Sequence, residues 1–314
     1  MKAVFINEYG GPEKLEYGDL PDPLPSQDQV LIRVIASSVN PVDWKVREGR
    51  LKFLSGKSFP LIVGSELSGE IVALGSGIND LKVGQRVFAG LSHKGGACAQ
   101  LASVNRNKVI PIPDELSYEL GSTLAIAGVT PLQAFTIHYP VKPGDVVLVN
   151  GASGGVGMYA VQIAKLLGAR VIAVCSAKNT EFVKSLGADE VIDYNQEDFR
   201  QRINSFDVVL DAAANAFFPE AKKCLKKGGM LIKLNMSIRS IVLQFWTRML
   251  ATRKLKMILL KNRQDDLQWL MNKIVNGEIK VEIETIYPLE KTREAHERSQ
   301  SGRVRGKLVI RIQE

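Results

Sequence analysis

The spacing of hydrophobic and polar positions changes partway along the chain. Up to about residue 120, short apolar runs alternate with turn clusters rich in Gly and Pro, and this pattern predicts a β-rich domain. The predicted strands are Ala3–Ile6, Val30–Ile35, Leu61–Val63, Gly69–Leu74, Arg86–Ala89, Ala97–Ala102 and Lys108–Pro111. Because Val30–Ile35 is almost continuously apolar, we expect that strand to be buried on both faces.

From about residue 117, strand-like runs alternate with helical patterns. This alternation predicts a parallel sheet covered by helices on both faces. Its predicted strands are Val146–Asn150, Arg170–Ser176, Val191–Tyr194, Asp207–Asp211 and Met230–Leu234. The alternation ends near residue 262, and we expect the tail, which closes with the strand Lys307–Ile312, to rejoin the first domain. The predicted domains are residues 1–121 with 264–314, and residues 122–263.

A glycine-rich turn joins the first two strands of the parallel sheet. Such a turn lets a pyrophosphate approach the backbone and the N–H groups at the start of the following helix. The usual spacing is G-x-G-x-x-G; here Ala152 takes the first position, and Gly154 and Gly157 take the others. A strand before the turn, and a helix and a strand after it, predict a dinucleotide site. The alternative is a glycine-rich turn that binds nothing.

The end of the second strand indicates which nucleotide is bound. NAD-binding folds place an Asp or Glu about 20 residues beyond the turn, where it binds the ribose 2′-OH. Here Ser176 and Lys178 follow the strand, and no carboxylate occurs before Glu181. A hydroxyl and an ammonium suit a 2′-phosphate, so the sequence predicts NADPH. The alternative for Lys178 is a solvated loop lysine.

Composition and charge narrow the class of protein. The chain has 314 residues, of which 45% are hydrophobic and 24% charged, as in globular proteins. Without a long apolar run or a recognisable targeting segment, we expect a cytoplasmic protein. The three cysteines are far apart, which argues against a disulfide framework.

The net charge of +8 is concentrated in residues 222–233 and 239–263. The second stretch also contains Phe245 and Trp246. A basic amphipathic helix can lie on a membrane. The interpretation we favour is a surface helix followed by a buried strand, Met257–Leu260.

Several blocks of sequence occur in a recognisable order. They are SVNPVDW at 38–44, VGSELSG at 63–69, GSG at 75–77, VGQRV at 83–87, AGVT at 127–130, NGASGGVG at 150–157, SLGAD at 185–189 and RGK at 305–307. Together they resemble the medium-chain dehydrogenase/reductase superfamily, in its zinc-free quinone oxidoreductase branch, over nearly the whole chain. Residues 91–96 and 178–194 are most similar to chloroplast-envelope quinone oxidoreductase homologues, with alkenal/enone oxidoreductases close by. The resemblance implies an α/β protein with a GroES-like β-rich catalytic domain and a doubly wound Rossmann domain.

The chain departs from the zinc-dependent alcohol dehydrogenases of that superfamily. Those enzymes bind catalytic zinc through a Cys after the second strand, the His of a Gly-His-Glu and a later Cys. Here Asn40–Asp43 holds no Cys, Ser65 replaces the His, and Cys98 is the only Cys where a structural zinc lobe needs four. Zinc needs three or four ligands at once, so we expect no metal. A conjugated acceptor, a quinone or an enone, needs less polarisation than a simple aldehyde.

The resemblance assigns four residues to chemistry. Asn40 is expected beside the nicotinamide, donating to a substrate oxygen or a bridging water, with an Asx cap before Pro41 as the alternative. Asp43 would orient Asn40 or only form a turn. Thr130 would contact the nicotinamide face, cap a helix, or both. His93 would donate a proton or be a loop histidine without a role.

The resemblance also implies substrate and nucleotide contacts. Trp44 and Phe53 would line an apolar substrate pocket or pack in the core. The expected nucleotide contacts are Gly154, Gly155, Val156 and Gly157 for the pyrophosphate, Ser176, Lys178 and Tyr194 for the 2′-phosphate, Ala212 and Leu234 near the nicotinamide, and Arg305 at the adenosine end. Tyr194 could equally be a surface aromatic residue.

These features predict an NADPH-dependent reductase of quinones or α,β-unsaturated carbonyls. The alternative is an NADPH-binding, largely non-catalytic, crystallin-like protein whose basic region contacts RNA or a membrane surface. We expect no obligate nucleic-acid partner. By analogy with the family, we expect a homodimer formed edge to edge through the Rossmann sheet.

Overall fold

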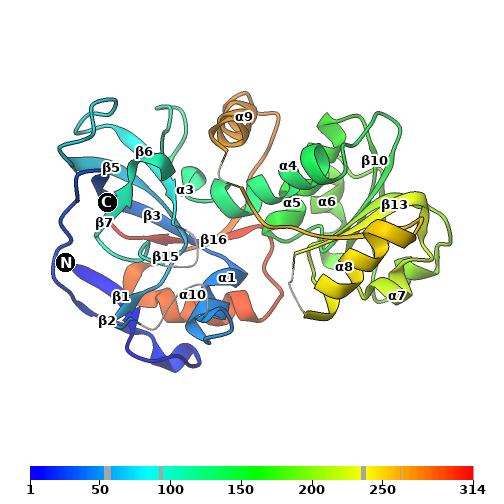
Figure 1. Ribbon diagram of the computed structural model, residues 1–314, viewed down its shortest axis with the longest axis horizontal. Coiled ribbons are helices and arrows are strands. Elements are labelled where there is room, and N and C mark those ends of the chain that lie inside the picture. The colour runs from blue at the N-terminus through cyan, green and yellow to red at the C-terminus, as the bar shows by residue number, and fades with distance from the viewer. Residues whose placement is uncertain (53–57, 92–94, 235–237, 262, 314) are drawn as a thin grey trace. The chain divides into compact units, whose positions relative to one another are not determined.

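The computed structural model describes residues 1–52, 58–91, 95–234, 238–261 and 263–313, and the chain divides into two compact units (Figure 1). Unit 1 comprises Met1–Ile126, Asn262–Glu278 and Ile283–Glu314; unit 2 comprises Ala127–Lys261 and Ile279–Glu282. The limits 1–121, 264–314 and 122–263 stay predictions of the domain boundaries. Within the described residues, no helix has both the length and the apolar character needed to cross a bilayer.

Unit 1 is built on two sheets. The smaller sheet has the order β2-β1-β4 and the larger one β15-β16-β3-β5-β6-β8, with β7 also paired to β3. The strands are β1 (Lys2–Ile6), β2 (Glu16–Asp19), β3 (Gln29–Val39), β4 (Leu61–Ile62), β5 (Glu66–Leu74), β6 (Arg86–Gly90), β7 (Leu101–Asn105), β8 (Val109–Pro111), β15 (Ile283–Pro288) and β16 (Lys307–Arg311). The helices are α1 (Pro41–Arg47), α3 (Tyr118–Gly121), α9 (Gln264–Val275) and α10 (Thr292–Gln300).

The long strand β3 organises the larger sheet. It pairs antiparallel with β5, with β7 and with β16, which comes from the end of the chain. The prediction that Val30–Ile35 is buried on both faces is wrong for the face that carries Leu31 and Arg33. Ile32 and Val34 are buried, but Arg33 is exposed and forms an ion pair with Glu70 of β5. The core therefore covers one face of the sheet here, and water reaches the other.

Two other predicted strands are shifted. Where Ala97–Ala102 was expected, β7 begins at Leu101, and Ala99 forms only an isolated bridge to Ala3. Where Met257–Leu260 was expected to be a buried strand, β14 ends at Met257, and Leu259 is 66% exposed. A run of apolar residues marks a strand locally, but the neighbouring strand decides where pairing starts and stops.

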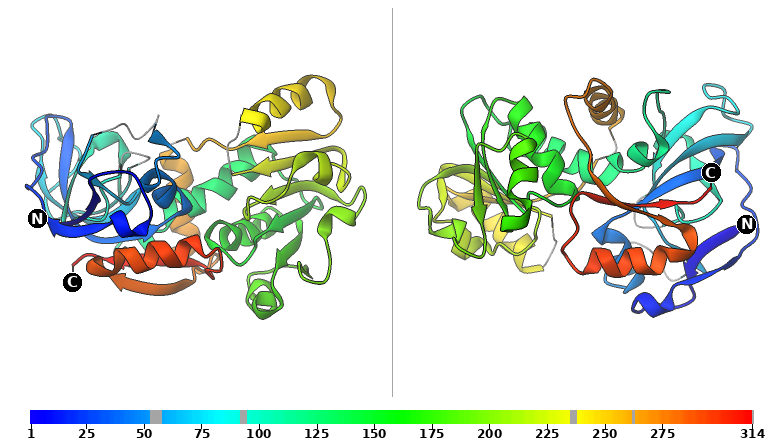
Figure 2. Two further views of the ribbon diagram at one scale, coloured as in Figure 1. Left: turned by 90° about the horizontal axis from the view of Figure 1, so that it is seen from below. Right: turned by 180° about the vertical axis from the view of Figure 1, so that it is seen from behind.

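Unit 2 contains one six-stranded sheet in which every neighbouring pair is parallel, in the order β11-β10-β9-β12-β13-β14. Its strands are β9 (Val146–Asn150), β10 (Arg170–Cys175), β11 (Glu190–Asp193), β12 (Phe206–Asp211), β13 (Leu225–Lys233) and β14 (Lys254–Met257). Its helices are α4 (Val129–Gln133), α5 (Gly155–Leu166), α6 (Thr180–Ser185), α7 (Phe218–Ala221) and α8 (Ile238–Leu250), with π-helical Ala134–His138 after α4. The π-helical turn Leu124–Gly128 precedes α4, and the limit between the two units falls within it. Figure 2 shows this sheet and its helices from two further directions.

The strand order of unit 2 confirms the predicted α/β class and doubly wound sheet. The order reverses at β9, whose neighbours β10 and β12 follow it in opposite directions. In such sheets, ligands bind outside the carboxyl ends of the strands at the point of reversal. The glycine-rich turn follows β9, so the fold places it at that point.

Candidate active site

A buried network of polar side chains lies where three strands of unit 1 meet. Asn40 follows β3, Glu66 begins β5 and Lys307 begins β16; each is at most 3% exposed. The antiparallel register brings these ends together, because Val39 pairs with Leu308 and Ser37 pairs with Leu67. Residues far apart in the sequence are thus forced into contact away from water.

Glu66 is the centre of this network. Its Oε1 accepts from Lys307 Nζ at 3.2 Å and Asn40 Nδ2 at 2.7 Å, and also from the Ser38 hydroxyl. Its Oε2 accepts from the backbone N–H of Ile126 at 3.0 Å. Donors from four residues in three segments of the chain therefore replace the water that a carboxylate loses on burial.

The side chain of Asn40 is held at both ends. Lys307 Nζ donates to its Oδ1 at 2.6 Å while its Nδ2 donates to Glu66. The backbone N–H of Asn40 donates to Asp43 Oδ2 at 2.7 Å, at the N-terminus of α1. Asp43 thus orients this turn in unit 1, while donation by Asn40 to a substrate stays a prediction.

Lys307 is the functional candidate that the sequence analysis missed. It was quoted only as part of the RGK block. An ammonium carries three N–H donors, and in the described part of the chain two acceptors, Asn40 Oδ1 and Glu66 Oε1, are within hydrogen-bond distance. A fixed buried cation with donor capacity left can stabilise negative charge on an oxygen.

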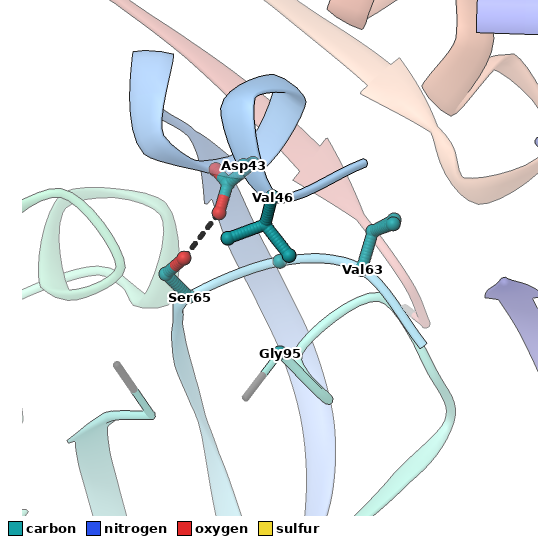
Figure 3. Close-up of a pocket in the computed structure, with 6 residues that line it drawn as sticks. Asp43, Val46, Val63, Ser65 and Gly95 are labelled. Carbon is teal, nitrogen blue, oxygen red and sulfur yellow. Dashed lines mark hydrogen bonds between the residues drawn. The ribbon is translucent and has the colours of Figure 1, made fainter. Parts of the chain in front are cut away.

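Asp43 and Ser65 face each other at a small pocket (Figure 3). The Ser65 hydroxyl donates to Asp43 Oδ1. The pocket, lined by Asp43, Val46, Val63, Gly64, Ser65 and Gly95, has room for about one water molecule. Ser65 stands where a zinc dehydrogenase carries its ligating His, and here it pairs with a carboxyl instead. Among the described residues, no three His, Cys, Asp or Glu side chains converge as a metal site requires.

Burial is the main reason that the pKa of Asp43 rises to about 7; the nearby Glu66 charge adds to the rise, while hydrogen bonds from Ser65 and Asn40 oppose it. A carboxyl with a pKa near neutrality can gain or lose a proton under working conditions.

Trp44 lies beside this network on α1 and is half-buried. Its indole Nε1 is buried and has no hydrogen-bond partner among the described residues. Lys45 Nζ lies 5.4 Å and the Arg50 guanidinium 5.5 Å from its ring centroid. Burial, with Arg50 nearby, lowers the pKa of Lys45, which makes its ammonium a better acid. Trp44 as a pocket wall stays a prediction; Phe53 and His93 lie outside the described residues.

The C-terminal end of α1 is fixed by a fully buried arginine. Arg47 donates to Gly10 O at 3.2 Å and to Gln300 Oε1 at 2.9 Å, and its Nη1 lies 3.2 Å from His296 Nδ1 of α10. Burial, and secondly Arg47, lower the pKa of His296 to about 3, so this histidine stays neutral. It serves the packing of α1 against α10.

In unit 2, the turn after β9 matches the requirements of a pyrophosphate. The first N–H groups of a helix have no acceptor within it, and α5 begins at Gly155 after the N-cap Gly154, which provides no side-chain cap. A Cβ on Gly157 would lie 2.1 Å from Gly151 O, so the packing of helix on turn admits only glycine there. A Cβ on Gly154 would meet nothing nearer than 3.6 Å. Close packing thus accounts for Gly157, and Gly154 leaves space beside the free N–H groups.

The loop after β12 is pinned to the same edge of the sheet. Asn150 Nδ2 donates to Asp211 Oδ1 at 2.8 Å and to Asn215 Oδ1 at 2.7 Å. The N–H of Ala212 donates to Asn150 O at 2.9 Å. Burial raises the pKa of Asp211, against the hydrogen bonds that it accepts. The predicted nucleotide residue Ala212 therefore lies at the reversal point, although its contact stays a prediction.

A polar corner forms at the ends of β10 and β11. Cys175 pairs with Asp193, and Tyr194 N donates to Cys175 O at 3.2 Å, which brings Ser176 and Tyr194 close together. Asn179, which the sequence analysis did not single out, donates to Ser153 Oγ at 3.1 Å and Ser176 Oγ at 3.3 Å. It ties this corner to the glycine turn. Lys178 and Tyr194 are exposed there.

The remaining predicted residues are distributed over both units. Thr130 is buried in α4, which packs against α5 of the nucleotide turn. Leu234 directly follows β13. Arg305 lies in unit 1, where its N–H donates to Glu284 Oε2 at 2.6 Å, so its role at the adenosine end stays a prediction.

We expect Asp43 to make stability depend on pH. Its pKa is about 7 when folded against an ordinary value of 3.8, so the folded state holds an extra proton in that window. The stability that this proton contributes is fully present below the ordinary pKa of 3.8. It is lost as the pH rises through the pKa of the folded state, about 7. Between about pH 5 and about pH 8, the free energy of unfolding measured in urea should fall by on the order of 2 kcal/mol more in wild type than in Asp43→Asn. Equal pH dependence of the two proteins would contradict this.

Removing the buried cation should be costly. Lys307→Met leaves Glu66 buried without its ion-pair partner, and we expect a loss of about 3–5 kcal/mol in the free energy of unfolding. Adding Glu66→Gln removes the stranded charge, so the double variant should be more stable than Lys307→Met alone. Denaturant titration of both variants measures this. A Lys307→Met protein as stable as wild type would refute the role of Lys307 as the necessary partner of buried Glu66.

Comparison with known proteins shows to which family this chain belongs. The profile described as "Alcohol dehydrogenase GroES-like domain" matches residues 26–131, and that described as "Zinc-binding dehydrogenase" matches residues 186–310. The "Chloroplast envelope quinone oxidoreductase homolog" of Arabidopsis thaliana is 34% identical over 99% of this chain and 98% of its own. The "NADPH-dependent alkenal/one oxidoreductase, chloroplastic" of the same plant is 29% identical over 99% of this chain and 79% of its own.

Comparison with a solved structure supports the same family. The quinone oxidoreductase from Coxiella burnetii superposes with a TM-score of 0.92 at 32% identity, covering 100% of this chain and 99% of that one. The GroES-like and Rossmann architecture expected from the sequence is therefore confirmed. The chain belongs to the quinone oxidoreductase branch of the medium-chain dehydrogenase/reductase superfamily and is an oxidoreductase.

Proposed function

We propose that this protein is an NADPH-dependent reductase that passes hydride to quinones or α,β-unsaturated carbonyls without a catalytic zinc. The observation that carries the proposal is the buried Lys307–Asn40–Glu66 network beside the Asp43–Ser65 pair. It provides a fixed, buried cation next to a carboxyl that can exchange a proton. The printed names of the Arabidopsis relatives, a quinone oxidoreductase homologue and an alkenal/one oxidoreductase, support the substrate classes.

Unit 2 supplies the residues that fit the nucleotide. The N–H groups of Gly155, Val156 and Gly157 would hold the pyrophosphate, and the space beside Gly154 admits it. Ser176, Lys178 and Tyr194 would surround the 2′-phosphate, with Asn179 holding Ser176 in place. When bound, the reduced nicotinamide supplies the hydride.

Unit 1 supplies the residues for the acceptor. Hydride addition to a conjugated acceptor leaves negative charge on its oxygen, and preorganised donors stabilise that charge. Lys307 Nζ is the donor that we assign to it. Trp44 Nε1, which has no hydrogen-bond partner among the described residues, is a second candidate donor. Asn40 holds the ammonium in position through its Oδ1. A proton then reaches the product carbon or oxygen from Lys45 or from solvent.

An activity panel tests the function. NADPH oxidation should be followed with 1,4-naphthoquinone, 9,10-phenanthrenequinone, acrolein and a long-chain enone. We expect turnover with at least one of them that survives treatment with a chelator, together with no stoichiometric zinc in the pure protein. Tight NADPH binding without turnover of any acceptor would favour the crystallin-like alternative. Activity that disappears with the chelator and returns with zinc would overturn the zinc-free mechanism.

Lys178 tests the choice of cofactor. Loss of one charge-assisted contact is worth about 1.5–3 kcal/mol, so Lys178→Ala should weaken NADPH binding about tenfold to a hundredfold. NADH binding should change little, because its ribose carries no phosphate. The matched control is Lys184→Ala, which changes an exposed lysine on the following helix α6. Nucleotide titration by calorimetry measures both, and equal effects on the two nucleotides would refute the 2′-phosphate site.

The homodimer and the cytoplasmic location expected from the sequence remain part of this proposal. Sedimentation of the purified protein and fractionation of the source cells test them.

A further inference from the structure

Helix α8 of unit 2 packs against the sheet mainly through polar side chains, together with the half-buried Leu243, which contacts the hydrophobic core of the unit. Ser240 and Thr247 are buried. Thr247 Oγ1 accepts from the N–H of Leu255 at 3.1 Å, and Gln244 Oε1 accepts from the N–H of Met257 at 2.6 Å. Polar side chains of α8 therefore bind the backbone of strand β14, where a surface helix ordinarily places apolar ones.

The opposite side of α8 is apolar and faces solvent. Between 49% and 68% of each side chain is exposed for Ile241, Val242, Phe245, Trp246 and Met249. At 3.6 residues per turn these five fall on one side of the helix, opposite Ser240 and Thr247. We call them the α8 face. Figure 2 shows α8 at the outside of unit 2.

The α8 face belongs to the most basic stretch of the chain. Residues 221–264 contain 12 of the 41 Lys and Arg residues and no Asp or Glu, while the rest of the chain has 29 basic and 33 acidic residues. The whole positive balance of the protein thus comes from this stretch. On a helical projection, Arg239 and Arg248 border the α8 face on its two sides, and both are exposed.

Charge complementarity indicates what kind of surface covers the α8 face. A symmetric contact with a second copy would set the same arginines against each other. Pairing of a second copy along β14 would need the N–H groups of Leu255 and Met257, which α8 already binds; the N–H of Ile258 points the other way, to Lys233 O. An edge-to-edge homodimer would therefore use the other edge strand of this sheet, β11, and would leave the α8 face open. Nucleic acid would attract the cations but leave Ile241, Val242 and Met249 in water. An anionic bilayer accepts both the cations and the apolar side chains.

We propose that α8 is a peripheral membrane anchor, which inserts the α8 face at the surface of a bilayer containing anionic lipid while Arg239 and Arg248 contact lipid phosphates. The inference rests on unit 2 alone and does not depend on the proposed reductase activity.

Flotation of the full-length protein with vesicles tests the anchor. Vesicles of phosphatidylcholine mixed with phosphatidylglycerol should carry the protein, and added salt should weaken binding. Phosphatidylcholine alone should bind weakly. The double variant Phe245→Ser/Trp246→Ser should reduce partitioning about tenfold or more. Arg239→Glu/Arg248→Glu should reduce it about fivefold or more per arginine.

Matched controls separate the anchor from general surface effects. Lys82→Glu and Val83→Ser change an exposed cation and an exposed apolar residue of unit 1, and should leave flotation unchanged. Because the side chains changed on α8 are exposed, circular dichroism and NADPH binding should also be unchanged. Lipids brominated on their acyl chains should quench Trp246, and the quenching should fall in Trp246→Phe.

Three results would overturn the proposal. The first is equal flotation with neutral and anionic vesicles. The second is absence of flotation together with sedimentation showing that Phe245→Ser/Trp246→Ser converts a dimer to a monomer, which would assign the α8 face to a second copy. The third is binding to single-stranded RNA without binding to anionic vesicles.

Discussion

The buried carboxylate of Glu66 is the constraint on which unit 1 depends. Moving an isolated carboxylate out of water costs several kcal/mol, and the fold is stable only if donors replace the lost hydration. Those donors come from Ser38, Asn40, Ile126 and Lys307, which span the chain from its first third to its last residues. The C-terminal strand β16 must therefore return to β3, and the same contact that satisfies Glu66 places an ammonium beside Asn40.

In the function that we propose, the two units stabilise negative charge in different ways. Unit 2 uses backbone N–H groups at a helix start, left free because Gly154 and Gly157 bring no side chains to the turn. Unit 1 uses side chains buried at strand ends, held by one another. Phosphate needs many weak donors over an extended surface, whereas charge that develops on one oxygen is stabilised best by a few fixed donors in a dry site.

In helix α8, the amphipathic pattern of the sequence and the observed packing disagree. Its amphipathic pattern would be satisfied by burying the apolar side, yet Gln244 and Thr247 bind the free N–H groups of β14. Unpaired N–H groups on an edge strand can pair with a strand of another chain, and the polar side chains of the helix prevent this by binding them. The apolar side is left outward in the most basic stretch of the chain, where a chemically matched surface can cover it.

Local patterns determined much of this protein. The alternation of strands and helices predicted the parallel sheet, and the glycine spacing together with Ser176 and Lys178 predicted the nucleotide turn, because these features depend on residues close in sequence. Lys307, Glu66 and Asn40 carried no such signal: their contact requires the antiparallel register of β3 with β5 and β16. The same reason explains the displaced ends of β7 and β14 and the outward face of α8. Periodicity shows which residues share a side of a strand or helix, but only long-range pairing decides what that side meets.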